Sequence, residues 1–194
     1  MKKLLFVSSS VFAFVLTIVS TQVAHAASGY YAGVSGGQSK VPDACDDLPG
    51  GFSCDDSDSA WKIFLGYQAT KNFGIEASFV DFGKFSVEFP VIGIFPVTVV
   101  AEASGFGVVG TGTVPLSERF GLFGKVGVFF WDVEARAVGI SGITFDDDGE
   151  DLAFGFGAKV NVTENISLRA EWEQFEEVSE EDVRLLSAGV VLSF

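Results

Sequence analysis

Apolar residues occur at every second position over long stretches of the chain, which is the spacing of a β-strand with one apolar face. In the stretch 60–69, Trp61, Ile63 and Leu65 share one face and Lys62 lies on the other. The same alternation is found in 73–83, 151–163 and 165–176. These stretches therefore predict strands that separate an apolar environment from a polar one.

The chain after residue 26 divides into eight such strands, three of which are rich in glycine and do not show which side faces inward. The predicted strands are 29–39, 60–69, 73–83, 98–114, 120–137, 151–163, 165–176 and 182–194. Short turns alternate with loops that are mostly long and acidic (40–59, 84–97, 138–150 and 177–181), which is typical of outer-membrane barrels. The expected fold class is all-β, an eight-stranded antiparallel up-and-down transmembrane β-barrel with both ends on the short-turn side.

The two ends of the sequence agree with this fold. Lys2 and Lys3, an apolar run and Ala24-His25-Ala26 predict a cleaved signal peptide over 1–26, leaving 27–194 as one barrel domain. No other segment approaches the roughly 20 apolar residues of a membrane helix. The last strand alternates and ends in an aromatic residue, so we expect Phe194 to engage the barrel-assembly machinery.

A soluble β-sandwich or lipocalin-like barrel would show the same period, with the apolar stripes facing inward. The signal peptide, Phe194 and the charged residues in the middle of strands favour the membrane barrel. The expected location is the outer membrane of a Gram-negative bacterium.

The charge of the chain excludes one class of partner. The net charge is −14, and removing residues 1–26 takes away two of 12 basic residues and no acid, which leaves −16. Nucleic acid is not an expected partner, because its binding needs a basic face. A barrel reconciles this acidity with a hydrophobic fraction of 48%, since apolar residues face lipid and acids collect in loops.

Three short motifs resemble the transmembrane domains of the OmpA-like family of small outer-membrane barrels. They are Gly66-Tyr67-Gln68 with Phe73-Gly74-Ile75-Glu76, the turn Pro115-Leu116-Ser117-Glu118-Arg119-Phe120-Gly121-Leu122, and the ending Leu186-Ser187-Ala188-Gly189-Val190-Val191-Leu192-Ser193-Phe194. The resemblance implies that Glu76, Lys125 and Arg169 belong to a network of lumen charges to which weak pore activity is attributed.

Six charged residues are predicted to face the lumen: Lys62, Glu76, Lys125, Lys159, Arg169 and Glu171. Side chains fill the interior of an eight-stranded barrel, and a charge buried without a partner costs several kcal/mol. These residues are therefore expected to form ion pairs. The pairs either plug the lumen or form a gate through which ions or small solutes pass.

Cys45 and Cys54 are the only cysteines, and we expect a disulfide bond between them in the first long loop of an exported protein. Metal binding by the two thiols is the alternative.

The second long loop, in contrast, is apolar. Its residues Phe89, Ile92, Ile94 and Phe95 are predicted to form an exposed patch for adhesion, self-association or contact with lipopolysaccharide. Extension of the barrel wall above the membrane is the alternative.

The acidic loops suit calcium or magnesium, but Asp146-Asp147-Asp148-Gly149 lacks the rest of a calcium-loop pattern, so no metal or cofactor is expected. The enzymes considered on small barrels use a histidine as general base, and the only histidine, His25, lies in the predicted signal peptide. The expected function is therefore non-enzymatic. It is a stand-alone outer-membrane barrel for envelope integrity or surface interaction, in contact with lipid, lipopolysaccharide and host or cell-surface ligands. The alternative is a narrow passive pore.

Overall fold

A computed structural model describes residues 29–42, 53–89, 97–138, 144–179 and 181–194. These residues form nine strands: β1 (Gly29–Lys40), β2 (Ser53–Asp55), β3 (Ser57–Gln68), β4 (Phe73–Phe89), β5 (Val97–Pro115), β6 (Phe120–Val138), β7 (Thr144–Asn161), β8 (Ile166–Val178) and β9 (Glu181–Ser193). Within the described ranges, no helix has the length and apolar character needed to cross a membrane. The predicted signal peptide, residues 1–26, lies outside the described residues.

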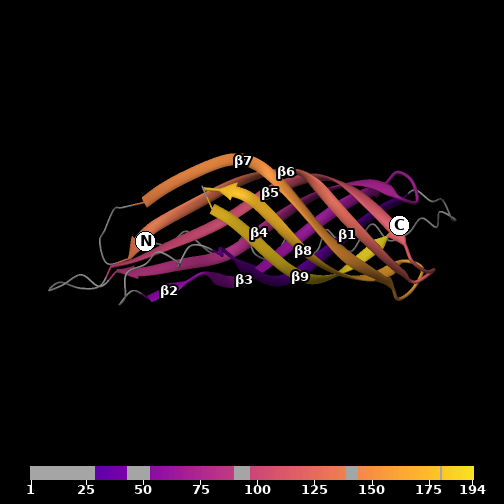
Figure 1. Cartoon of the computed structure of the whole chain (residues 1–194), viewed down its shortest axis with the longest axis horizontal. Coiled ribbons are helices and arrows are strands. Elements are labelled where there is room, and N and C mark those ends of the chain that lie inside the picture. Colours follow the sequence, from indigo (N-terminus) through magenta and orange to yellow (C-terminus); the bar gives the residue numbers. More distant parts are fainter. Residues whose placement is uncertain (1–28, 43–52, 90–96, 139–143, 180) are drawn as a thin grey trace, which may run out of the picture.

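Eight of these strands close into an antiparallel barrel (Figure 1). Each strand from β3 to β9 pairs with its neighbour in sequence, and β1 joins β3 to β9. The short β2 pairs with the far end of β4 only. The predicted eight-stranded up-and-down barrel is therefore confirmed, with β2 as an addition at one rim.

The strands extend further at the long-loop end than the sequence pattern predicts. β4 continues to Phe89 and β7 begins at Thr144, so the prediction of loops over 84–97 and 138–150 is wrong for part of each range. Hydrogen-bonded pairing persists from Lys84 opposite Glu102 to Phe89 opposite Val97. These extensions carry polar residues on their outward face, so they lack the alternation that marks a strand in lipid.

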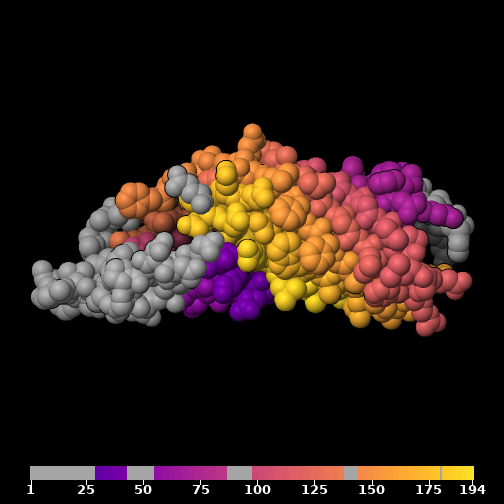
Figure 2. Space-filling view, in the orientation of Figure 1, coloured from indigo at the N-terminus to yellow at the C-terminus, as the bar shows by residue number. Residues whose placement is uncertain are grey.

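The outer face of the barrel middle is apolar, since large hydrophobic side chains on the strands are exposed there. Figure 2 shows side chains covering the outside of the barrel on the side in view. On β3, Trp61, Ile63 and Leu65 are 44%, 48% and 54% exposed, as their shared face predicts. The apolar outward positions of β6 end at Phe130, and the next outward residue is Asp132. The apolar belt is the surface that lipid covers in a transmembrane barrel, so the strands project beyond the membrane at their long-loop, external end.

The interior contains two layers that differ in polarity. A charged layer fills the middle of the lumen. An apolar cluster lies above it, toward the external end: Val41, Ala60, Val80, Phe82, Ala103, Phe129, Trp131, Ala153, Phe175, Val178, Val183 and Leu185. The glycine-rich strands supply the predicted Lys125 to the lumen from β6, together with Phe129 and Trp131, and small residues such as Ala103 from β5.

Candidate functional site

The charged layer joins strands from several parts of the barrel. It contains Lys62 from β3, Glu76 from β4, Lys125 from β6, and Arg169, Glu171 and Glu173 from β8. All six side chains are buried, with exposures between 0% for Lys62 and 7% for Lys125. Three cations face three carboxylates, so the layer has no net charge when all six residues are ionised.

Both lysines bridge carboxylates of β8. The Nζ atom of Lys62 contacts Glu171 and lies 2.5 Å from Oε2 of Glu173. The Nζ atom of Lys125 lies 2.8 Å from Oε2 of Glu171 and 3.8 Å from Oε1 of Glu76, and it also contacts Glu173. Each lysine therefore forms ion pairs with at least two carboxylates. This attraction offsets the free-energy cost of burying the charges.

Arg169 is held by two carboxylates and two aromatic rings. Its Nη1 and Nη2 atoms lie 2.5 Å and 3.2 Å from the two oxygens of Glu76, and Nη2 also lies 2.8 Å from Oε2 of Glu171. The guanidinium carbon lies 4.7 Å from the ring centroid of Phe64 and 4.2 Å from that of Phe123, within the range of cation–π attraction. This combination of carboxylates and rings fixes the position of the guanidinium group.

The apolar layer above the charges is centred on three phenylalanines. The ring centroids of Phe82 and Phe129 are 5.6 Å apart, those of Phe82 and Phe175 are 4.9 Å apart, and those of Phe129 and Phe175 are 4.5 Å apart. All three side chains are at most 2% exposed. These three buried rings occupy the lumen on the external side of the charged layer.

The structure brings five of the six predicted lumen charges together, and Lys159 stands apart. Its side chain is half-buried and makes no ion pair within the described residues. Lys159 lies opposite Arg169 in the pairing of β7 with β8, so its nearest charged neighbour across the ladder has the same sign.

Sequence reasoning missed one member of the layer, Glu173, and one hydrogen-bond donor to it, Tyr31. Glu173 is two residues beyond Glu171 on the same face of β8, so the strand period alone identifies it. Tyr31 donates a hydrogen bond from its hydroxyl group to Oε2 of Glu76, at 3.1 Å. The glycine-rich character of β1 hid the facing of this tyrosine.

The other predicted sites fall mainly on parts that the structure does not describe. Cys45, Ile92, Ile94 and Phe95 lie outside the described residues. The backbones of Cys54 and Phe89 pair with Val87 and Val97, and their side chains are not described. The disulfide bond and the apolar loop patch therefore stay predictions. Among the residues described, no group of three or more histidine, cysteine or acidic side chains is placed to hold a metal ion.

The family model for the outer membrane protein beta-barrel domain matches residues 9–194. No curated protein sequence matches.

Several solved structures share the fold. OprG from Pseudomonas aeruginosa is 12% identical, with 85% of this chain and 93% of that chain covered and a TM-score of 0.58. The N-terminal β-barrel domain of Pseudomonas aeruginosa OprF is 11% identical, with 86% and 98% covered and a TM-score of 0.56. Ail, the attachment invasion locus protein of Yersinia pestis, is 16% identical, with 86% and 97% covered and a TM-score of 0.55. At these identities the likeness is one of fold.

Proposed function

The chain belongs to the outer membrane protein beta-barrel domain family, and on that premise we propose that it is a sealed barrel acting in envelope integrity or in interactions at the cell surface. Its place is the outer membrane of a Gram-negative bacterium. Outer-membrane lipid and the acyl chains of lipopolysaccharide are the partners proposed for its apolar belt.

The observation that carries this proposal is the filling of the lumen. A neutral layer of ion-paired side chains lies on the short-turn side of an apolar layer. The inward residues of the barrel middle form these two layers. An ion that crosses the phenylalanine layer would give up its hydration, at a cost of several kcal/mol. The six residues of the charged layer are also engaged in ion pairs with one another, which supports a non-enzymatic role.

Interaction at the surface is supported by the external extensions of the strands. Ail, which shares this fold, was also solved in complex with the heparin analogue sucrose octasulfate. The external strands of the present chain carry a surplus of carboxylates, which repel a polyanion such as that ligand. A surface ligand for this chain is therefore expected to be cationic.

A narrow passive pore is the second candidate function. Lys125 contacts three carboxylates, and such shared partners permit exchange between ion pairs without a fully unpaired state. Exchange of this kind would open the charged layer, although it leaves the phenylalanine layer in place.

Single-channel recording in planar bilayers separates the two functions. We expect no conductance steps from the refolded wild-type protein or from Glu76→Ala, because Phe82, Phe129 and Phe175 still close the lumen. Glu134→Ala, which removes an exposed carboxylate of β6, is the matched control. Conductance steps that Glu76→Ala alters and Glu134→Ala does not would establish the pore instead.

A further inference from the structure

The barrel wall separates between β7 and β8 at its external end. These strands pair only from Ala153 opposite Phe175 to Asn161 opposite Ser167. On its other side, β7 stays paired with β6 as far as Thr144 opposite Arg136. Thr144–Leu152 is therefore an edge with one neighbour among the described residues, and Figure 1 shows β7 continuing past the ends of β8 and β9.

The β8–β9 hairpin produces this separation. Its register shifts between Phe175 and Val178, and Glu177 and Ser179 have left-handed backbone angles, with φ of 49° and 51°. The carboxylate of Asp182 fixes the bend, since it accepts hydrogen bonds from Nε2 of Gln174 at 2.9 Å and from the Glu177 backbone N–H at 3.4 Å. The end of β8 is thus held away from β7.

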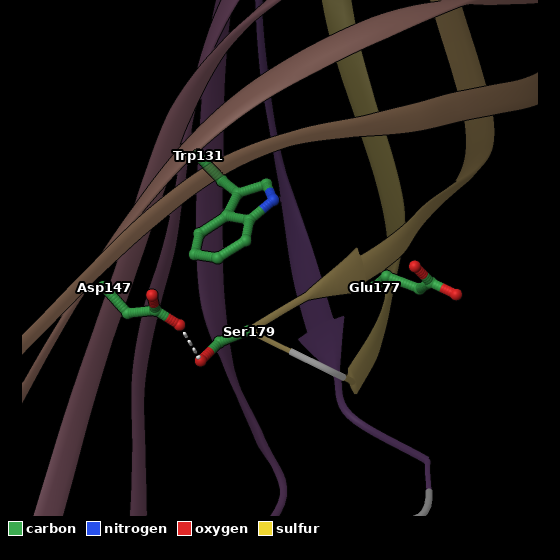
Figure 3. Close-up of a pocket in the computed structure, with 4 residues that line it drawn as sticks. All are labelled: Trp131, Asp147, Glu177 and Ser179. Carbon is green, nitrogen blue, oxygen red and sulfur yellow. Dashed lines mark hydrogen bonds between the residues drawn. The ribbon is translucent and has the colours of Figure 1, made fainter.

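A cavity of about 340 Å³ lies at this separation, lined by Trp131, Asp147, Glu177 and Ser179 (Figure 3). The Trp131 ring packs directly against Gly149, because a Cβ atom added to Gly149 would lie 2.5 Å from the ring. Its Nε1 atom donates a hydrogen bond to Oδ2 of Asp151 at 2.9 Å. The hydroxyl group of Ser179 donates to Oδ2 of Asp147 at 2.8 Å, across the opening. The cavity thus has an aromatic wall beside the Asp147 carboxylate, and Glu177 lies at its rim with its carboxylate directed away from the Trp131 ring (Figure 3).

The edge itself is acidic. Thr144–Leu152 contains five carboxylates and no basic residue: Asp146, Asp147, Asp148, Glu150 and Asp151. An edge strand presents backbone N–H and C=O groups that can pair with another chain, and its side chains alternate between the two faces. Backbone pairing and charge together define the chemistry of a fitting partner.

We propose that an extended peptide segment rich in lysine or arginine adds to the edge of β7 as a further strand. One cationic side chain of the peptide enters the cavity beside the Asp147 carboxylate, against the Trp131 ring, and Glu177 adds negative charge at the rim. The inference rests on the proposed function only in placing the ligand at the external surface, so a conducting lumen would not remove it.

The first test uses the wild-type protein in zwitterionic micelles and three synthetic peptides of about the length of the edge. One alternates lysine with valine, the second is the same peptide with every second backbone nitrogen methylated, and the third has glutamate in place of lysine. Fluorescence anisotropy is expected to show binding of the first peptide only, because methylation removes the strand hydrogen bonds and glutamate reverses the charge. Equal binding of the methylated peptide, or no binding of the first, would overturn the proposal.

The second test compares two double variants that each remove two negative charges. Asp147→Asn with Glu177→Gln changes the cavity, whereas Asp132→Asn with Glu134→Gln changes exposed residues of β6 that lie opposite Asp148 and Asp146. We expect the cavity variant to bind the lysine peptide roughly tenfold more weakly and the control variant to bind it nearly as the wild type does. Equal weakening by both variants would show attraction to a diffuse surface charge and contradict a defined site.

Discussion

Arg169 and Glu76 form a bidentate ion pair across the lumen. The distance from Nη1 to Oε2 is 2.5 Å and that from Nη2 to Oε1 is 3.2 Å. Their strands, β8 and β4, are not neighbours in the barrel. The pair therefore connects different parts of the wall through the interior. Without Arg169, the cation nearest to Glu76 among the described residues is the Nζ atom of Lys125 at 3.8 Å, so the buried carboxylate loses most of its compensation.

Replacing Arg169 alone should therefore destabilise the barrel more than replacing both partners. We expect Arg169→Met to lower the free energy of unfolding by about 3–5 kcal/mol, since Glu76 and Glu171 lose their shared cation. Adding Glu76→Gln should restore part of this loss. Urea unfolding in micelles measures both variants, and a double variant that is less stable than the single one would contradict the pairing argument.

The phenylalanine layer should be equally sensitive to truncation. Phe175 is 2% exposed and packs on Phe82 and Phe129, so Phe175→Ala should cost about 3–5 kcal/mol through lost contacts and an internal cavity. Phe106→Ala is the matched control, because that side chain is 48% exposed on the outer face. The same unfolding measurement should show a much smaller loss for the control, and equal losses would mean that the layer is not packed as described.

The sequence predicted the barrel because lipid imposes a strict alternation on the strands. Trp61 and Lys62 already assign the two faces of β3, one exposed to lipid and one buried in the lumen. The external extensions were missed, since Asp146, Asp147 and Asp148 are polar on both faces and resemble a loop. The partners within the charged layer depend on register and barrel closure, which a single strand does not reveal. Lys159 illustrates this limit, because its facing was predicted and its lack of an ion pair was not.

The pairing of β4 with β5 shifts in register between Asp81 and Lys84, which forms a bulge at the external rim. The hydrogen bonds that hold this bulge should weaken in acid. Asp58 accepts hydrogen bonds from the backbone N–H groups of Lys84 at 2.8 Å and of Ser59 at 2.7 Å, which holds the pKa of its carboxyl group below its ordinary value of 3.8. Because this pKa is lowered in the folded protein, its stabilising effect is complete above pH 3.8 and is lost as the pH falls through the lower folded pKa.

Nuclear magnetic resonance of the Lys84 amide measures this titration. Its chemical shift should change only at a pH below 3.8 in the wild type and should not titrate in Asp58→Asn, which keeps the shape without the charge. A wild-type midpoint above 3.8 would mean that the hydrogen bonds to the carboxylate do not hold the bulge.

The predicted disulfide bond between Cys45 and Cys54 has a direct chemical test. Both thiols should resist alkylation until the protein is reduced, because a bridged sulfur has no free thiolate. Cys45→Ser with Cys54→Ser should leave the barrel stability nearly unchanged, since the bridge closes a loop at the rim and β2 pairs with β4 only. Rapid labelling of the unreduced protein would show that the cysteines are free.

Phe194 closes the seam of the barrel against β1, and its removal should slow assembly. Its backbone N–H donates to the Tyr30 carbonyl at 2.9 Å, the Tyr30 N–H donates to the Phe194 carbonyl at 3.2 Å, and the two rings stack with centroids 6.5 Å apart. The Phe194 ring is 56% exposed, so it contributes little burial once the barrel has formed.

Deleting Phe194 removes both the hydrogen bonds and the ring, whereas Phe194→Ser removes only the ring. The fraction of protein that reaches the outer membrane and migrates faster on gels when unheated should rise more slowly for both variants if the ring guides assembly. A normal rate for Phe194→Ser with a slow rate for the deletion would assign the effect to the backbone hydrogen bonds at the seam instead.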